Sequence, residues 1–216
     1  MIQFKFFLGG FDKNLSYLIW CDKTNRAALV DPSVKSDEIL KFLNFKKLNL
    51  EKILITHSHS DHVSCLDDFN EILNCKLKIY ISYKTKFDYH NIIKVKNNQT
   101  IKVGKYIIKC LLTPGHYYDS TSFWVKDYKL IFTGDTMFIG RTGRTISSGS
   151  SINDLYNSIY NILLKLPNDT LILPGHDYGY KMFDTIQNNI KNSSFFRCKN
   201  FNEFTTVMNN YEKSRK

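Results

Sequence analysis

The chain has 216 residues, of which 43% are hydrophobic and 23% are charged, and its formal net charge is +10. This size and composition predict one globular domain, residues 1–216, with one sizeable core. No apolar stretch approaches the roughly 18 residues that cross a bilayer, so no membrane span is predicted. The lysines are dispersed among Asn and Ile, which favours a solvated surface over a nucleic-acid groove.

Location is predicted from the cysteines and the N-terminus. Five scattered cysteines without a C-x-x-C pair argue against a disulfide framework or a structural zinc knuckle. Residues 1–8 are too short for a secretory signal and lack its basic flank and cleavage site. We therefore expect a cytoplasmic protein with reduced thiols, and leave an organellar location open.

The first half of the chain alternates strands and helices. A strand is expected to begin at the N-terminus. Further strands are predicted at 14–20, 26–30, 53–55 and 77–81. Helical spacing of apolar residues predicts helices at 37–48 and 62–73.

The second half begins with two hairpins, 100–103 with 106–112 and 122–125 with 130–132. A helix is predicted from Ser151 to about residue 166, because Ser151 and Asp154 have capping-box spacing. A strand at 171–173 and helices at 182–190 and 201–211 follow, so the tail from about residue 181 is expected to be helical. No linker or second domain is predicted in this α/β chain.

Four metal-binding side chains lie within six residues, directly after the apolar run 53–55: His57, His59, Asp61 and His62. Histidine is the commonest metal ligand, since its neutral imidazole binds borderline metals at physiological pH. A loop that leaves a strand can turn these positions toward one point. The cluster therefore predicts a metal site, with room for two ions.

Three later turns repeat the pattern of a buried-type strand, a small or Gly/Pro turn and a ligand-type side chain. They end in His116, Asp135 and His176. Glycine and proline suit such turns because glycine permits unusual dihedrals and proline fixes one. We expect these three side chains to join the cluster, and we expect His90 to be a surface residue.

The series of seven side chains resembles that of the metallo-β-lactamase superfamily, with matching motifs from Asp31 to about Tyr178. Residues 134–138 and 174–178 resemble the glyoxalase II and persulfide dioxygenase branches. The resemblance implies a four-layer αββα sandwich, with the ligand turns gathered at one edge.

The resemblance also implies two divalent metal ions, with zinc first and iron or manganese as alternatives. One ion would be held by His57, His59 and His116. The other would be held by Asp61, His62 and His176. Asp135 would bridge them, and Asp61 and Asp135 would be the catalytic carboxylates. Two such metals can share a hydroxide that attacks a carbonyl, which implies a hydrolase of a small thioester, similar to hydroxyacylglutathione hydrolase.

A second function fits the same residues. His57, His116 and Asp135 would form the two-histidine, one-carboxylate face that suits a single Fe(II) with open positions for O₂ and substrate. The other four side chains would then surround this face. Persulfide dioxygenases oxidise glutathione persulfide in this way. An RNA-processing nuclease is a third, less favoured function, because no basic groove is predicted.

The segment 138–145 leaves the branch open. Glyoxalase II commonly has Gly-Cys-Gly-Arg followed by Phe-Phe-Glu-Gly, whereas persulfide dioxygenases follow it with Thr-Asp-Phe. Here Thr142 replaces the cysteine, and Thr145 favours the dioxygenase, but the Asp-Phe pair is missing. Only about 40 residues follow His176, which is short for the helical extension of glyoxalase II.

Substrate contacts are predicted for two residues. Arg144 could bind a carboxylate through its planar fork, or tie down its own Gly-rich loop. Tyr178 could hydrogen-bond a substrate or only pack the rim of the site, and Arg141 is expected at the surface. The expected partner is a small anionic molecule, with a glutathione conjugate among the candidates. A homodimer is left open.

Overall fold

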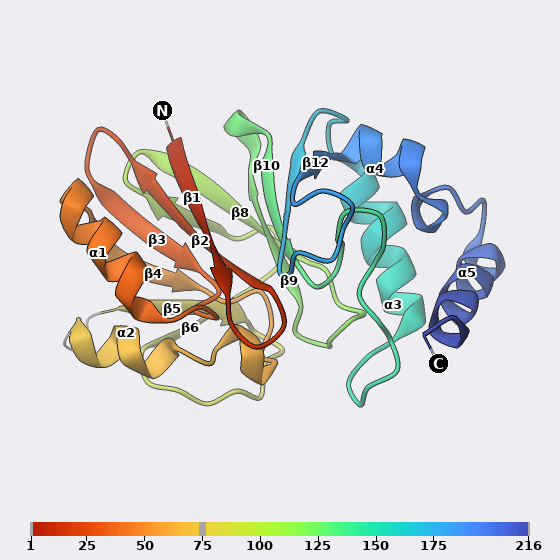
Figure 1. Ribbon diagram of the computed structural model, residues 1–216, viewed down its shortest axis with the longest axis horizontal. Helices are drawn as coiled ribbons and strands as arrows, with labels where there is room; N and C mark the ends of the chain where they lie inside the picture. The colour runs from red at the N-terminus through yellow and green to blue at the C-terminus, as the bar shows by residue number, and fades with distance from the viewer. Residues whose placement is uncertain (1, 74–76, 216) are drawn as a thin grey trace.

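Two six-stranded mixed β-sheets pack face to face, with helices on both outer faces (Figure 1). The computed structural model describes residues 2–73 and 77–215. Strand order is β1-β2-β3-β4-β5-β6 in the first sheet and β12-β11-β10-β9-β8-β7 in the second. This arrangement confirms the predicted αββα sandwich.

The first sheet is antiparallel at one edge and parallel at the other. Its strands are β1 (Ile2–Gly9), β2 (Asn14–Cys21), β3 (Arg26–Val30), β4 (Asn49–Leu54), β5 (Lys78–Ser82) and β6 (Ile92–Val95). Helices α1 (Ser36–Lys46) and α2 (Leu66–Ile72) cover its outer face. Side chains alternate along β2: Tyr17 and Ile19 face the core between the sheets, while Leu18 faces the core under the helices.

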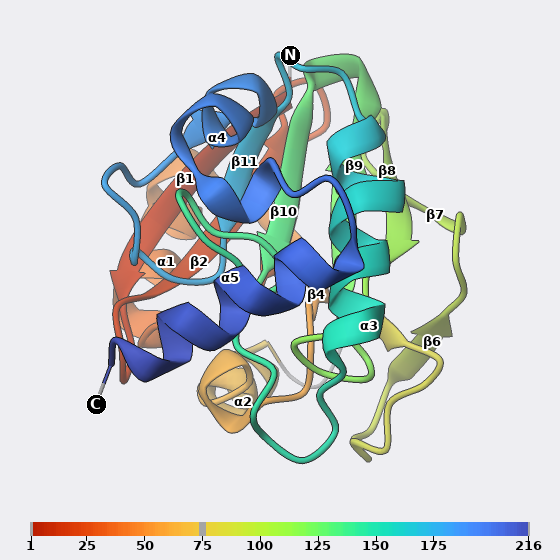
Figure 2. The same ribbon diagram turned by 90° about the vertical axis from the view of Figure 1, so that its right-hand side faces the viewer.

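The strands of the second sheet are β7 (Thr100–Val103), β8 (Tyr106–Leu112), β9 (Thr121–Val125), β10 (Leu130–Gly134), β11 (Leu171–Pro174) and β12 (Asp184–Thr185). Helices α3 (Ile152–Asn157), α4 (Ile186–Asn192) and α5 (Phe201–Lys213) lie on its outer face (Figure 2). The helical path of α3 continues as a π-helical turn and a 3-10 turn to Lys165. The predicted cap is present, since the Ser151 hydroxyl accepts a hydrogen bond from Asp154 N.

Two predicted helix starts were wrong. His62 lies in a 3-10 turn (Ser60–His62), and α2 begins only at Leu66. Residues 182–185 are not helical, because Asp184 and Thr185 pair with β11 as β12. The Thr185 hydroxyl then caps α4 by accepting a hydrogen bond from Asn188 N. Strands β6 and β12 were not predicted.

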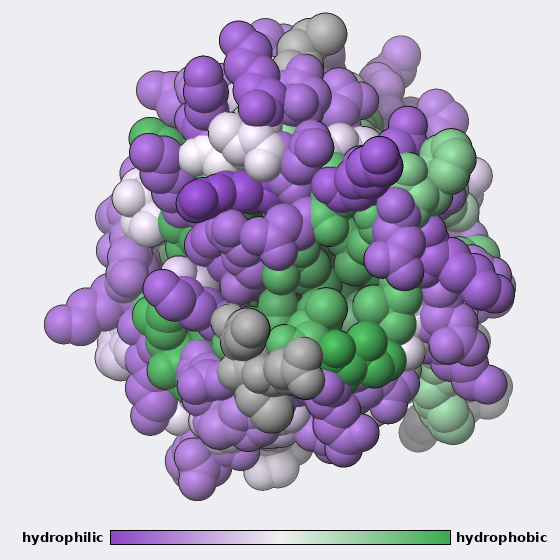
Figure 3. All heavy atoms as spheres, turned by 90° about the vertical axis from the view of Figure 1, so that its left-hand side faces the viewer, coloured by the Kyte–Doolittle hydropathy of each residue, from purple (hydrophilic) through white to green (hydrophobic). Residues whose placement is uncertain are grey.

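The face on the side of the first sheet is largely polar. Figure 3 shows hydrophilic side chains over most of this face, around a smaller hydrophobic area. His90 is exposed, as predicted. In the part of the chain that the structure describes, no helix combines the length and apolar character needed to cross a membrane.

Candidate metal centre

All seven predicted ligand side chains meet at one end of the sandwich. Four come from the loop after β4, and the other three follow β8, β10 and β11. β4 belongs to the first sheet and β8, β10 and β11 to the second, so both sheets supply ligand side chains. Chain segments more than 100 residues apart therefore supply one site.

The potential ligand atoms fall into overlapping sets within which every atom lies within 4.8 Å of the others. One set is His57, His59 and His116. A second set is Asp61, His62 and His176. A third joins His57, His62 and Asp135. The first two sets match the two triads that the sequence resemblance implied.

Asp135 lies between the two triads. Its Oδ2 is 3.6 Å from His116 Nε2 and 3.3 Å from His176 Nε2, while its Oδ1 is 3.3 Å from His62 Nε2. Oδ2 thus lies near one histidine of each triad, and Oδ1 lies near the second triad. A carboxylate placed in this way can bridge two cations, which is the role that the resemblance implied for Asp135.

Four imidazoles are oriented through Nδ1. His62 Nδ1 lies 2.9 Å from Asp31 Oδ2, and His57 Nδ1 lies 3.2 Å from Thr56 Oγ1. The other two face backbone carbonyls, with His116 Nδ1 2.9 Å from Arg144 O and His176 Nδ1 2.7 Å from Asp12 O. When Nδ1 donates its proton outward, the Nε2 lone pair faces the centre, which is how ligand histidines are held in metalloproteins.

The electrostatics of the centre favour a cation. Burial, followed by His62, lowers the pKa of His57, while burial and His116 lower that of His59 to about 4. Both imidazoles therefore stay neutral, which is the metal-binding form. Burial opposes charge on Asp135 too, but His62 and His176 outweigh it and lower the pKa of this carboxyl.

Two packing features show that the residues fit bound cations. His57 Nε2 faces His59 Nδ1 at 3.0 Å, and His62 Nε2 faces His176 Nε2 at 3.1 Å. The buried Oδ1 of Asp135 accepts no hydrogen bond. Nitrogens that face one another around an unsatisfied carboxylate oxygen form the donor set that a divalent ion of the zinc type prefers.

The absence of a side chain at Gly175 makes room for two members of this donor set, Asp135 and His62. A Cβ at this position would overlap Asp135 Oδ1 and would lie 2.7 Å from His62 Cε1. Only a residue without a side chain lets β11 approach β10 here, where Gly175 N donates to Gly134 O at 2.9 Å.

Three supporting residues were not among the predicted site residues. Asp31 accepts hydrogen bonds from Thr56 N and Thr56 Oγ1, both at 2.7 Å, besides holding His62. Asn14 donates to Asp61 Oδ2 at 2.8 Å. The ring of Tyr117 lies 4.1 Å from that of His59. Asp31 stood in a recognised motif and Tyr117 follows His116, but Asn14 gave no signal in the sequence.

A cavity of about 390 Å³ opens beside the centre. It is lined by Asp12, Lys13, His116, Asp135, Phe138, Arg141, Gly143, Arg144, Tyr178 and Arg215. It contains both residues for which substrate contacts were predicted, Arg144 and Tyr178.

Arg144 and Tyr178, for which substrate contacts were predicted, have different partners in the structure. Arg144 holds Glu212 of α5 through two nitrogens, with Nε 2.8 Å from Oε1 and Nη2 2.6 Å from Oε2. Arg144 thus ties the loop after β10 to α5, and does not tie down its own loop. Tyr178 stacks on His176 at 4.6 Å and donates its hydroxyl to Asp12. Arg141 was expected at the surface, which was wrong: it is half-buried and lines the cavity.

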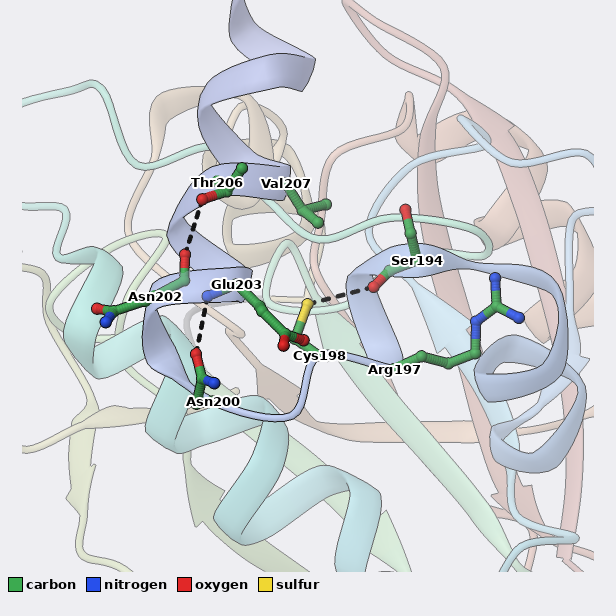
Figure 4. Close-up of a pocket in the computed structure, with 8 residues that line it drawn as sticks. All are labelled: Ser194, Arg197, Cys198, Asn200, Asn202, Glu203, Thr206 and Val207. Carbon is green, nitrogen blue, oxygen red and sulfur yellow. Dashed lines mark hydrogen bonds between the residues drawn. The ribbon is translucent and has the colours of Figure 1, made fainter.

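A second cavity, of about 600 Å³, lies where α5 begins (Figure 4). Its polar side chains serve the helix itself, since Asn200 caps α5 by accepting a hydrogen bond from Glu203 N at 3.0 Å. Cys198 donates to Ser194 O at 3.3 Å. None of the predicted ligand side chains lines this second cavity.

The fold and the site define a class of protein. A family model of the metallo-beta-lactamase superfamily matches residues 9–176, so the chain belongs to this superfamily. The probable polyketide biosynthesis zinc-dependent hydrolase BaeB of Bacillus velezensis is 32% identical over 202 residues, 91% of this chain and 87% of that protein. The hydroxyacylglutathione hydrolase of Francisella tularensis subsp. novicida is 33% identical over 192 residues, 89% of this chain and 74% of that one.

A solved structure supports the same class. The crystal structure of ETHE1 from Myxococcus xanthus is similar to this chain with a TM-score of 0.84 and 27% identity, over 97% of this chain and 91% of that one.

Proposed function

We propose that the protein hydrolyses small thioesters with two bound divalent metal ions, of which zinc is the first choice. The observation that carries the proposal is the pair of ligand triads joined by Asp135. Two similar proteins support it by their names, one a zinc-dependent hydrolase and one a hydrolase of hydroxyacylglutathione, which is itself a thioester.

Divalent metal ions in such a pair would supply Lewis-acid stabilisation of an oxyanion and would activate water near neutral pH. His57, His59 and His116 would hold one ion, and Asp61, His62 and His176 the other. Asp31 and the carbonyls of Asp12 and Arg144 keep three of these imidazoles turned inward. Asn14 holds Asp61 in place through its side-chain amide.

The cavity beside the centre would receive the substrate. None of the side chains that line it is a serine or cysteine, so no covalent nucleophile of those types faces the substrate there. Phe138 and Tyr178 give it apolar walls close to His176, with ring centroids 6.1 and 4.6 Å from the imidazole.

Metal analysis combined with two activity assays tests the proposal. Two metal ions per chain with cleavage of S-lactoylglutathione and no O₂ uptake are expected. One iron per chain with O₂ uptake on glutathione persulfide would instead establish the dioxygenase, in which His57, His116 and Asp135 hold the metal. Asp135→Ala should abolish either activity, whereas Asp184→Asn, a buried aspartate near α4, serves as the matched control.

His59 separates the two schemes. It is a ligand in the two-metal scheme and only a neighbour of the metal in the one-iron scheme. His59→Ala is expected to remove one metal ion and at least 100-fold of the hydrolysis, since a missing ligand changes metal affinity directly. Retention of full metal content and activity would contradict the two-metal assignment.

The cytoplasmic location, the lack of nucleic-acid binding and a homodimer stay predictions. Cell fractionation, tRNA and DNA gel retardation at physiological salt, and sedimentation analysis test them in turn.

A further inference from the structure

Arg141 holds its charge in an aromatic cage. Its guanidinium carbon lies 4.5 Å from the ring centroid of Tyr178, 5.0 Å from that of Phe138 and 5.3 Å from that of Tyr211. Three rings from three separate segments fix the side chain by cation–π contacts. The guanidinium is therefore positioned, not mobile, at the wall of the cavity beside the metal centre.

No carboxylate pairs with Arg141 among the residues that the structure describes, and its side chain makes no hydrogen bond there. The charges of two acids reach it, those of Asp135 and Glu212. Asp135 lies among the predicted ligand histidines, and Glu212 is already bonded to Arg144 through two nitrogens. Asp12, the other acid near the rim, accepts the hydroxyl of Tyr178. A half-buried guanidinium with open donors is costly unless something satisfies them.

Two further cations line the same cavity. Lys13 comes from the turn between β1 and β2, and Arg215 follows α5. Arg215 donates to the Tyr211 hydroxyl at 2.9 Å and so lies against the cage. Burial first, and then the charge of Arg215, lowers the pKa of Arg141, although Tyr211, Tyr178 and Asp135 act in the opposite direction. A cavity that gathers such charges suits an anion.

We propose that Arg141, assisted by Arg215 and Lys13, binds a carboxylate or phosphate group of the substrate while the scissile thioester lies at the metal centre. The position of the thioester at the metal centre rests on the proposed hydrolase function. It assigns specificity to Arg141 and not to Arg144, because Glu212 already occupies the Arg144 fork.

Matched thioester pairs test the proposal. S-Acetyl-N-acetylcysteine and S-acetyl-N-acetylcysteamine differ only by a carboxylate. S-Acetylpantetheine and its terminal phosphate ester differ only by a phosphate. The metal-loaded protein is expected to have a kcat/KM at least roughly tenfold higher for the charged member of one pair, mainly through KM, since a charged hydrogen bond has about this effect. The pair that shows it identifies the anion.

Arg141→Met keeps the stem within the cage and removes the charge. Its ratio of kcat/KM values, charged over neutral, is expected to fall to about one. Arg141→Lys should keep part of the ratio, because the charge remains without the planar fork. Arg197→Met, an exposed arginine at the second cavity, should keep the full ratio. A wild-type ratio of one for both pairs, or an unchanged ratio in Arg141→Met, would overturn the proposal.

A binding measurement separates this inference from the hydrolase proposal. If no thioester is cleaved, the hydrolase function fails, but calorimetric titration with N-acetyl-S-hexylglutathione and its neutral diethyl ester still tests Arg141. The charged probe is expected to bind at least roughly tenfold more tightly to the wild type, and Arg141→Met should remove the difference. Equal binding of the two probes to the wild type would contradict the anion site. Thermal melting of each variant shows that it is folded.

Discussion

Hydrogen-bond acceptors that are not themselves predicted ligands orient the imidazole rings of the metal centre. Asp31 adopts a left-handed backbone conformation, with φ 49°, which turns its carboxylate toward both Thr56 and His62. One buried carboxylate thus ties the end of β3 to the ligand loop after β4. Its hydrogen bond to His62 Nδ1 fixes the imidazole tautomer and strengthens the ring as a ligand.

Asp31→Asn is expected to weaken metal affinity by roughly 10- to 100-fold, as losing such a supporting carboxylate generally does. Asparagine tolerates the left-handed backbone, so the fold should persist. Competition with a chromophoric chelator measures the affinity. Asp184→Asn, which removes a buried carboxylate far from the centre, should leave it unchanged. Equal affinities in the wild type and Asp31→Asn would contradict the role of Asp31.

Gly175→Ala is expected to abolish metal binding at the second triad, because the new methyl group would occupy the space of Asp135 Oδ1. Activity should fall at least 100-fold, since displacement of a reacting group by about 1 Å costs that much. Metal content and kcat together check this. An alanine variant with full metal content would show that β11 can move away from β10.

The seven ligand side chains could be predicted from sequence because each closely follows an apolar run that ends a strand. Arg141 could not be placed in this way. Its cage joins Tyr178 and Tyr211, which lie 37 and 70 residues further along the chain, and only packing brings them together. The partner of Arg144 was missed for the same reason, since Glu212 lies 68 residues away.

Helix α5 holds two arginines of the cavity beside the metal centre in place, Arg141 through Tyr211 and Arg144 through Glu212. Phe204 is fully buried and its ring lies 5.6 Å from Tyr156 and 5.9 Å from Tyr160 in the helical segment that begins with α3. Glu212, two turns further on, holds Arg144 of the ligand-bearing loop. The helix thus joins the outer layer of the second sheet to the metal centre.

Glu212→Gln is expected to reduce the free energy of unfolding by only about 0.5 kcal/mol, because both partners are partly exposed to solvent. Arg144, through its hydrogen bonds, lowers the pKa of Glu212 in the folded protein. The stabilisation is therefore present above the ordinary glutamate pKa and is lost as the pH falls through the lowered one.

Urea unfolding of the wild type and Glu212→Gln between pH 7 and pH 3 checks this dependence. The difference between the two should shrink on acidification. Asp169→Asn, which removes the exposed partner of Lys129, provides a control with little effect at any pH. If the difference in the free energy of unfolding grew at low pH, the predicted direction of the pH dependence would be wrong.

Short edge strands were the least predictable elements. β6 has four residues, of which only Val95 is buried, and β12 has two. Burial does not alternate along β6, unlike along the equally short β7, and β12 is too short to show a pattern. Their pairing with β5 and β11 therefore depends on the finished sheets. The longer strands had clear apolar runs, which is why the sandwich itself was predictable.

At the scale of the whole molecule, the centre lies where the two sheets meet. β2 of the first sheet contributes Leu15, whose amide donates to Gly175 O at 2.8 Å, and Tyr17, whose hydroxyl donates to Pro174 O at 2.7 Å. Cations held by ligands from both sheets would join them further. Metal binding should therefore stabilise the entire fold.

Chelation is expected to lower the melting temperature, and zinc added afterwards should restore it. At a free metal concentration of 100 times Kd, the binding contributes about 2.7 kcal/mol per site to stability. Differential scanning calorimetry with and without chelator measures the change. In Asp135→Ala the shift should shrink, because the bridging carboxylate is missing. A melting temperature independent of metal would contradict a site that spans both sheets.

The carbonyls that orient His176 and His116 belong to Asp12 and Arg144, in the same two loops that bring Lys13 and Arg141 to the cavity. An anion drawn to those cations would restrain both loops. By thermodynamic linkage, the metal and the anion must then change each other's affinity by the same factor. The protein could thus retain its metals best when its substrate is abundant.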